Sequence, residues 1–413
     1  MYLKAKISSY SALIGSLFSG LALLAGSAAA QEAAPQADPA AYDNCLASLR
    51  SKGVFTGISA ATWAQAAPQL QADASVLPLL NKQPEFSMPV WDYLAVLVDE
   101  ERVRDGKAAA KAWGDVLQQM GQRYRVSPYL VAGVWGVESN FGQNLGGRPL
   151  ITSLSTLSCF GRRQAYFQGE LAATLRIVQS GDVPVDKLKG SWAGAFGQTQ
   201  FMPSTFLRLA QDGDGDGHKD IVSSVPDALA STANFLAKAG FRPGQPWGYE
   251  VRLPANYQGI NGRKNKQSIS AWRAAGISLP NGAALPDSLP QAGLLLPAGA
   301  AGPAFLVGKN FDTLYSYNAS ENYALAIAHL ADLIEAKSSQ PGFAAPWPTD
   351  DPSLSRAQNR QLQSLLLAKG YDIGTADGMI GAKTREAIKI EAAKLGLPAT
   401  GRAGQKLLRA LQR

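Results

Sequence analysis

The chain has 413 residues, of which 46% are hydrophobic and 17% charged, a composition that excludes disordered and fibrous proteins. Its length allows two or three domains. The net charge of +7 belongs to the end of the chain, because residues 354–413 hold eleven Lys/Arg and four Asp/Glu and the rest is neutral. A basic terminal module favours a polyanionic partner, such as nucleic acid, anionic lipid or an acidic wall polymer.

The first thirty residues have the pattern of a secretory signal. Lys4 and Lys6 precede an apolar run over 12–25, and small residues continue to Ala30. We therefore predict a signal peptide at 1–30 and export of the chain, which removes nucleic acid from the expected partners. The alternative is an uncleaved membrane anchor, but the run is short for a span. No Cys follows it closely, so lipid attachment is not expected, and no later segment is long and apolar enough to cross a bilayer.

The only two cysteines are Cys45 and Cys159. In an exported chain a single pair indicates one disulfide, and two buried free thiols are the alternative.

After a flexible leader at 31–41, residues 42–126 are predicted to be helical. Ser127 and Pro128 have the pattern of a helix start, an N-cap followed by proline at the first helical position. Apolar residues then recur on one helical face: Leu130, Val134 and Val137.

The composition changes after Gly240, where polar and turn residues become frequent. Residues 249–253 alternate like a strand, and 305–307 give a second strand signal within a segment rich in Gly, Pro, Asn and Ser. We interpret 246–312 as a small β part. A helix is predicted again over 320–335.

Residues 337–353 form a Pro-rich linker. The module that follows, 354–413, has its own apolar pattern and is predicted to be a three-helix unit with this core: Leu362, Leu365, Leu366, Ala387, Ile388, Leu407, Leu408 and Leu411.

Within the segment VAGVWGVESNFG at 131–142, Glu138 stands at the end of an otherwise apolar helix. Val134 lies four residues earlier, which places Glu138 on or beside the buried face of the helix. A carboxylate near Trp and Val loses hydration of its charged form, so its pKa is expected to rise and to keep it protonated near neutral pH. Cleavage of a glycosidic bond needs such an acid for the leaving oxygen. A solvated surface glutamate is the plain alternative.

A second motif, SWAGAFGQTQFMPST, occupies 191–205. Its glycines, Gly194 and Gly197, let backbone approach a bulky sugar closely. Gln200 offers two donors and an acceptor to an N-acetyl group, and Ser191 is placed to orient Glu138 by a hydrogen bond. The alternative is a Gly-rich packing loop between helices.

Taken together and in this order, the two motifs resemble those of the lysozyme-like lytic transglycosylases, in the version of the lytic murein transglycosylase B family. The resemblance spans roughly Tyr42 to Glu335 and implies a periplasmic protein with a mainly α (α+β) fold. It divides a catalytic domain at 31–336 into these parts: a helical part (42–126), a lysozyme-like core (127–245), the small β part (246–312) and a closing helix (313–336).

The resemblance also implies substrate-binding residues outside the two motifs. Tyrosines stack on sugar faces, and arginines pair with the carboxylates of the stem peptide. The alternative is that these residues have only a structural role, the tyrosines in the core and the arginine pair at the solvated surface. One departure is Phe235, where the family has a tyrosine, so that a hydroxyl near the site is missing. The matching residues are Tyr93, Arg162, Arg163, Tyr317, Asn318 and Tyr323.

The mechanism that the resemblance implies uses one carboxylic acid, and the sequence offers no obvious second one. Glu138 protonates the oxygen between N-acetylmuramic acid and N-acetylglucosamine, and the substrate's N-acetyl group stabilises the charge on the sugar. Glu138 then takes the proton of the muramyl 6-hydroxyl, which closes a 1,6-anhydro ring without water or a catalytic cofactor. The alternatives are a hydrolytic muramidase and a catalytically silent wall-binding scaffold. The expected partners are glycan strands and other cell-wall proteins, and the protein is expected to be a monomer.

An Asp-Gly repeat at 212–220 fits the first half of a Ca²⁺ loop. The second half departs, because Ser223 stands where such loops have Glu, and the resemblance implies that Asp227 closes the loop instead. We expect a structural Ca²⁺ without a catalytic role; a flexible turn is the alternative. The expected ligands are Asp212, Asp214, Asp216, His218 through its backbone carbonyl, and Asp227.

The terminal module resembles the type 1 peptidoglycan-binding domain through Gly370-Tyr371, the turn at 377–381 and Gly396. It has Ile390-Glu391 where the family has Phe-Gln. Binding of the wall would raise the local concentration of glycan at the cleft, and a spacer without affinity is the alternative.

Overall fold

The computed structural model describes residues 38–81, 88–336 and 342–413. These residues are mainly helical, with one two-stranded and one four-stranded sheet, as the predicted fold class requires. Residues 37–413 cluster as one unit. The predicted signal peptide at 1–30 lies outside the described residues. Within the described ranges, every helix is too short or too polar to span a membrane.

The N-terminal helices pack on the pair α8 and α9, around a core that includes Leu49, Leu154 and Leu171. A disulfide between Cys45 and Cys159 joins the first helix to the end of α8, with 5.8 Å between the two Cα atoms. The elements are α1 (Pro39–Arg50), η1 (Gly53–Phe55), α2 (Ala60–Ala66), η2 (Ala67–Gln69), η3 (Ala74–Asn81), α8 (Leu150–Cys159) and α9 (Gln164–Ser180).

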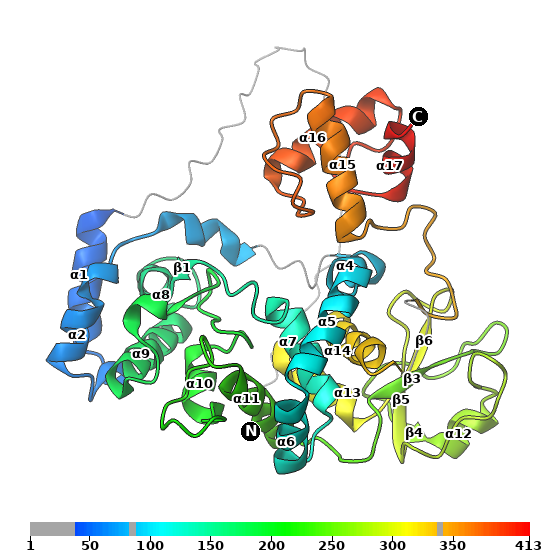
Figure 1. The fold of residues 1–413 in the computed structure, drawn as a ribbon, viewed down its shortest axis with the longest axis horizontal. Helices are drawn as coiled ribbons and strands as arrows, with labels where there is room; N and C mark the ends of the chain where they lie inside the picture. The colour runs from blue at the N-terminus through cyan, green and yellow to red at the C-terminus, as the bar shows by residue number, and fades with distance from the viewer. Residues whose placement is uncertain (1–37, 82–87, 337–341) are drawn as a thin grey trace, which may run out of the picture. The chain divides into compact units, whose positions relative to one another are not determined.

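Helix α7 carries Glu138 and lies against α5, α6, α11 and α14 (Figure 1). Its glycines explain the close packing. A Cβ at Gly133 would lie 2.8 Å from the Ile327 carbonyl oxygen, and one at Gly136 would meet Leu330 at 2.8 Å. The elements are α4 (Val90–Leu97), α5 (Glu100–Ala112), α6 (Gly114–Tyr124), α7 (Pro128–Ser139), α11 (Val225–Lys238) and α14 (Glu321–Ile334).

The segment between α9 and α11 contains the second motif. Buried Glu170 of α9 fixes the start of α10, because its carboxylate accepts hydrogen bonds from the backbone N–H and the hydroxyl of Ser204. The elements here are β1 (Arg148–Pro149), η4 (Val185–Lys187), β2 (Lys189–Gly190) and α10 (Pro203–Leu209).

The small β part is an antiparallel sheet in the order β3-β6-β5-β4, with Gly248 opposite Val307. Both strand signals of the sequence are confirmed as β3 and β6. Trp272 fills the core beneath the sheet and donates a hydrogen bond to the Ala292 carbonyl. The elements are β3 (Gly248–Val251), β4 (Gln267–Ser268), α12 (Ile269–Ala274), β5 (Gln291–Leu295) and β6 (Ala304–Val307).

The closing segment consists of two helices rather than the single one expected at 313–336. Helix α13 (Lys309–Asn318) begins earlier and stops at Ala319, which has left-handed backbone with φ of 50°. Ser320 then caps α14 by accepting a hydrogen bond from the Tyr323 N–H. The corner between the helices places tyrosines from both near Glu138.

The terminal module forms the predicted three-helix unit. Ser355 and Gln358 form a capping box at the start of α15. Buried Gln363 holds the Asp377-Gly378 turn, since its carbonyl oxygen accepts from the Gly378 N–H and its amide donates to Asp377. The helices are α15 (Arg356–Ala368), α16 (Ala382–Lys394) and α17 (Gln405–Leu411).

Candidate active site

The end of α7, where Glu138 lies, is fixed by its neighbour Ser139. The Ser139 hydroxyl donates to the Gln198 carbonyl (2.6 Å) and accepts from the Gly142 N–H (2.9 Å). At the other end Ser127 caps the helix, as predicted, by accepting from the Leu130 N–H. The catalytic-motif helix is therefore anchored at both ends, and its last turn is bonded to the second motif.

Glu138 is half-buried, and among the described residues its carboxyl group has one hydrogen-bond donor, the hydroxyl of Tyr323, which points at Oε1. Burial raises the pKa of Glu138 to about 8, and the Tyr323 hydrogen bond opposes that rise. Burial and the nearby charge of Glu138 hold the pKa of the Tyr323 hydroxyl well above its ordinary value, so it remains a donor. Glu138 is thus a protonated acid at neutral pH with Oε2 left for a ligand.

An aromatic group backs the carboxyl. The rings of Tyr317 and Tyr323 are stacked with centroids 6.1 Å apart, and the Tyr317 hydroxyl donates to the Thr199 carbonyl (2.7 Å). The ring centroids of Phe235 and Tyr317 lie 4.5 Å apart. Phe235 therefore places an apolar ring where the family resemblance implies a tyrosine with its hydroxyl. Half-buried Tyr93 of α4 lies near enough to Tyr323 to contribute to its raised pKa, after burial, Glu138 and Tyr317.

The corner that holds these tyrosines is bridged from the β part. Arg263, only 8% exposed, pairs with Asp312 of α13 at 2.6 Å and approaches Glu321 of α14 at 3.4 Å. Its guanidinium carbon lies 3.7 Å from the centroid of Tyr315. The small β part therefore fixes the angle between α13 and α14, a function that no sequence motif indicated.

The side chains of the second motif are used mainly within the loop. The Gln200 amide donates to the carbonyls of Leu145 (3.1 Å) and Gly197 (2.9 Å), which leaves only its oxygen for a ligand. Ser191 accepts from the Ala195 N–H (3.0 Å), whereas among the described residues Glu138 accepts its hydrogen bond from Tyr323.

The glycines of that motif serve packing. Gly194 and Gly197 have φ of 99° and 72°, and a Cβ at either would meet Leu154 or Ile221 at 2.7 Å. The loop is thereby pressed against the core rather than opened toward a sugar.

The expected arginine pair diverges. Arg162 donates to the Leu80 carbonyl, and Arg163 lies over the ring of Tyr166 at 4.4 Å. Asn318 is the exposed last residue of α13. The structure therefore brings Tyr317 and Tyr323 to Glu138, while the arginines lie on a separate exposed surface.

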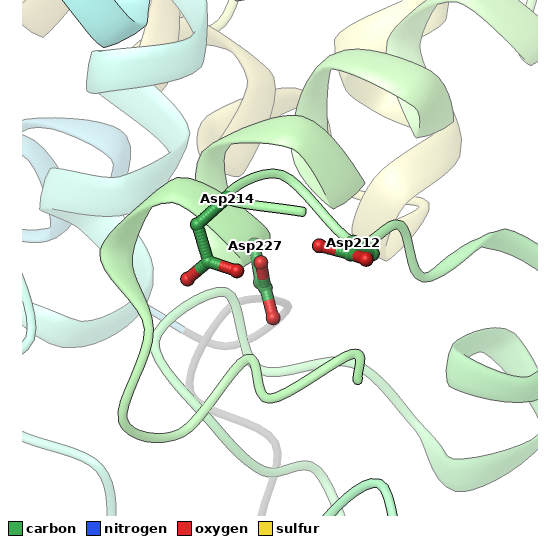
Figure 2. Close-up of side chains that lie close together, drawn as sticks. All are labelled: Asp212, Asp214 and Asp227. Carbon is green, nitrogen blue, oxygen red and sulfur yellow. The ribbon is translucent and has the colours of Figure 1, made fainter. Parts of the chain in front are cut away.

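Three of the expected metal ligands gather into one group. Single carboxylate oxygens of Asp212, Asp214 and Asp227 lie within 4.8 Å of one another, and Figure 2 shows the three side chains converging. Asp216 lies outside that group and accepts from the His218 N–H.

The electrostatics of this group fit a hard cation. Asp227 is completely buried, and burial, followed by the charge of Asp214 among the raising influences, lifts its pKa, although backbone N–H groups of Gly213 and Asp220 oppose the shift. Backbone N–H groups of Gly217 and Gly215 lower the pKa of Asp212. Three converging carboxylates with one of them buried match the oxygen ligands that Ca²⁺ prefers.

Sequence reasoning missed Gln198, whose side-chain oxygen accepts from the Trp135 indole N–H at 3.0 Å. It also missed Ser139, although this residue adjoins Glu138. Both lie inside the motifs, so the signal was present, but only the contact between two distant segments reveals their part in positioning α7.

Two known families match the chain. Residues 41–332 match the family described as "Transglycosylase SLT domain", and residues 355–411 match "Putative peptidoglycan binding domain". Among curated proteins, the membrane-bound lytic murein transglycosylase B of Escherichia coli (strain K12) is 34% identical over 276 residues, which is 63% of this chain and 74% of that protein.

Solved structures are similar as well. SltB3 from Pseudomonas aeruginosa, in complex with NAG-anhNAM-pentapeptide, is 42% identical with a TM-score of 0.72, and the match covers 90% of this chain and 99% of that one. The Escherichia coli lytic transglycosylase Slt35 in complex with calcium is 31% identical with a TM-score of 0.61, covering 73% and 94%.

Proposed function

The chain belongs to the transglycosylase SLT domain family, and from this premise we infer that it is a lytic transglycosylase that cleaves the glycan strands of peptidoglycan. The site supports the same conclusion independently. Its central group is one carboxylic acid, Glu138, with a pKa of about 8 that keeps it protonated at neutral pH. That single observation carries the proposal.

Glu138 acts first as the general acid. The Tyr323 hydroxyl is bonded to Oε1, so the acidic proton is carried on Oε2. Oε2 donates this proton to the oxygen of the β-1,4 bond between N-acetylmuramic acid and N-acetylglucosamine. The hydrogen bond from Tyr323 then stabilises the carboxylate that forms, because a hydrogen bond to the charged form favours it.

Glu138 acts next as the base. No carboxylate contributes to the pKa shift of Glu138 among the described residues, which favours a route without a second acidic group. The substrate's own N-acetyl group stabilises the sugar cation, and the Glu138 carboxylate takes the proton of the muramyl 6-hydroxyl. That oxygen closes the 1,6-anhydro ring, so the proton returns to the acid and no water is consumed.

The experiment is digestion of intact sacculi with the purified protein and with its Glu138→Gln variant, followed by mass analysis of the released fragments. A lytic transglycosylase releases 1,6-anhydro fragments, which are lighter by one water than the fragments of a hydrolytic muramidase. Products with ordinary reducing ends would mean that the protein is a hydrolytic muramidase and not a lyase. Undiminished digestion by Glu138→Gln would remove Glu138 from the mechanism.

The other substrate contacts follow from the geometry. Tyr317, Tyr323 and Tyr93 supply an aromatic wall beside the acid, and the free oxygen of Gln200 accepts from an N-acetyl N–H. Ser191, Asn318 at the end of α13 and the diverging arginine pair at 162–163 contact more distant parts of the strand.

The calcium site is structural. Asp212, Asp214 and Asp227 hold the ion, and bound Ca²⁺ offsets the repulsion among their carboxylates and fixes the loop before α11. The ion takes no part in the reaction. The related Slt35 was crystallised with calcium, and this supports the choice of metal.

The chain works in the periplasm, where its substrate lies, after removal of the signal at 1–30. Residues 31–336 form the catalytic domain and 337–353 the linker. The module at 354–413 binds peptidoglycan, and its net positive charge suits an anionic wall.

A further inference from the structure

A cavity of about 650 Å³ lies between helices α4 and α5, the loop after α7 and the terminal module. Asn140 and Asn144 line it from the catalytic side, only two and six residues after Glu138. Met379 and Arg385 line it from the module. The cavity therefore begins beside the end of the catalytic helix, and its far wall exists only because the module is docked.

Arginine–carboxylate pairs hold the module in place. Arg402 binds Asp92 through two bonds of 2.7 Å, and Arg356 binds Asp99 through bonds of 2.7 and 2.9 Å. The Asp99 side chain is 1% exposed. Two-point pairing of this kind fixes both distance and orientation, so the wall of the cavity is rigidly placed.

The guanidinium groups face the cavity and most of their partners lie behind them. Arg356, Arg360 and Arg402 line the cavity, together with the carboxylates of Asp92 and Asp377. Asp99 and Glu101, the partners of Arg356 and Arg360, do not line it. In all, five arginines and two aspartates line the cavity, so its lining carries a net positive charge. Arg356 and Arg360 use one or two nitrogens each for these pairs, which leaves N–H groups for a further acceptor.

Two more arginines of the lining have no carboxylate partner among the described residues. Arg102 is 8% exposed, donates through Nη1 to the Gly136 carbonyl, and has an Nε without a hydrogen-bond acceptor. Arg385 is exposed and makes no side-chain hydrogen bond or ion pair within the described ranges. Burial, followed by repulsion from Arg356, lowers the pKa of Arg102 to about 10, although the charges of Asp99 and Asp105 oppose the shift.

We propose that this cavity binds the carboxylates of a peptidoglycan stem peptide while the attached glycan occupies the site at Glu138. The proposal rests on the proposed function and extends it, because it adds a peptide site made jointly by the catalytic domain and the module. Guanidinium groups recognise carboxylates, and the amides of Asn140 and Asn144 suit the peptide bonds between them.

Arg385→Gln tests the site without disturbing the pairs that dock the module. Arg409→Gln is the matched control, because Arg409 is an exposed arginine of the same module outside the cavity lining. Two substrates are compared at equal chain length, peptide-bearing and peptide-free glycan. We expect Arg385→Gln to lower kcat/KM about five- to tenfold for the peptide-bearing chain only, as for the loss of one hydrogen bond between charged groups.

Binding supplies the second readout. The inactive Glu138→Gln variant is titrated with free stem tetrapeptide and with the same peptide amidated at its carboxyl groups. We expect the first to bind and the second to bind at least about fivefold more weakly. Equal behaviour of Arg385→Gln and Arg409→Gln, or equal binding of both peptides, overturns the peptide site. Neither outcome affects the test of the reaction, which depends on the anhydro product and on Glu138.

Discussion

Two glutamates in this chain accept a hydrogen bond from a tyrosine hydroxyl, and yet their pKa values are shifted in opposite directions. Glu138 accepts from Tyr323 and has a pKa of about 8, raised by burial. Glu391 of the terminal module accepts from Tyr371 at 2.6 Å and has a pKa of about 2, lowered chiefly by its hydrogen bond from Lys394. The difference is the cation. A neutral donor alone does not offset the loss of water around a carboxylate, whereas an ammonium group does.

The largest effect is expected at the acid itself. Glu138→Gln removes the proton donor, and we expect the rate of anhydro-product release to fall by about 10³-fold or more, within the range of general acid catalysis. The rate is measured by chromatography of fragments from soluble glycan chains.

The matched variant is Glu391→Gln, which makes the same change at the other glutamate. It is expected to leave the rate on short chains within about twofold, since its charge takes no part in the reaction. Similar losses in both variants would mean that the comparison of the two glutamates does not report on catalysis.

Tyr323→Phe sharpens the comparison by removing the neutral donor. The hydroxyl favours the ionised form of Glu138, so its removal raises the pKa of Glu138 further. Activity requires the protonated acid and is lost as pH rises through that pKa. The alkaline limb of kcat/KM, expected near pH 8, should therefore move to higher pH.

The same variant should lower kcat by about 10- to 100-fold, because one hydrogen bond to the carboxylate formed in the reaction is lost. If the alkaline limb of the pH–rate profile stayed at the same pH, Tyr323 would have no influence on the pKa of Glu138.

The third group of carboxylates is the cluster of Asp212, Asp214 and Asp227, whose charge we expect a bound Ca²⁺ to neutralise. Removal of Ca²⁺ by a chelator is expected to lower the melting temperature, since a ligand at 100 times its Kd stabilises the fold by about 2.7 kcal/mol. Asp227→Asn should abolish this calcium-dependent shift. Asp216→Asn, which changes a carboxylate outside the converging group, should retain most of it. Calorimetry with and without added Ca²⁺ distinguishes them.

The smallest effect is expected from Lys394→Met, which removes the cation beside Glu391. The folded pKa of Glu391 is depressed, so its contribution to stability is complete above the unfolded pKa of about 4.3 and is lost as pH falls through about 2. Lys394 is 61% exposed, so solvent screening keeps the loss at pH 7 small.

Denaturant unfolding at several pH values measures this loss, which should vanish near pH 2. Lys383→Met is the control, because Lys383 and Asp372 pair in the open at the surface. A loss that stays constant down to pH 2 would mean that Lys394 acts by packing and not through the charge of Glu391.

The sequence by itself determined the local features of this protein. Periodicity placed Glu138 near the buried face of α7, the Ser127-Pro128 pair marked its start, and alternation located β3 and β6. These features depend on residues within one or two turns of each other, which a linear pattern records directly. The Asp-Gly spacing likewise indicated the acidic loop.

Only the tertiary structure decided how those features act. The hydroxyl that donates to Glu138 comes from Tyr323, 185 residues away. The amide of Gln200 donates to backbone carbonyls, one of which lies 55 residues away in the sequence, so the motif alone does not predict these bonds. Arg263 bridges α13 and α14, and the pairs of Arg356 and Arg402 dock the module. Hydrogen bonds and burial arise between segments that folding brings together, so the pKa of a carboxylate is a property of the packed site and not of its neighbours in the chain.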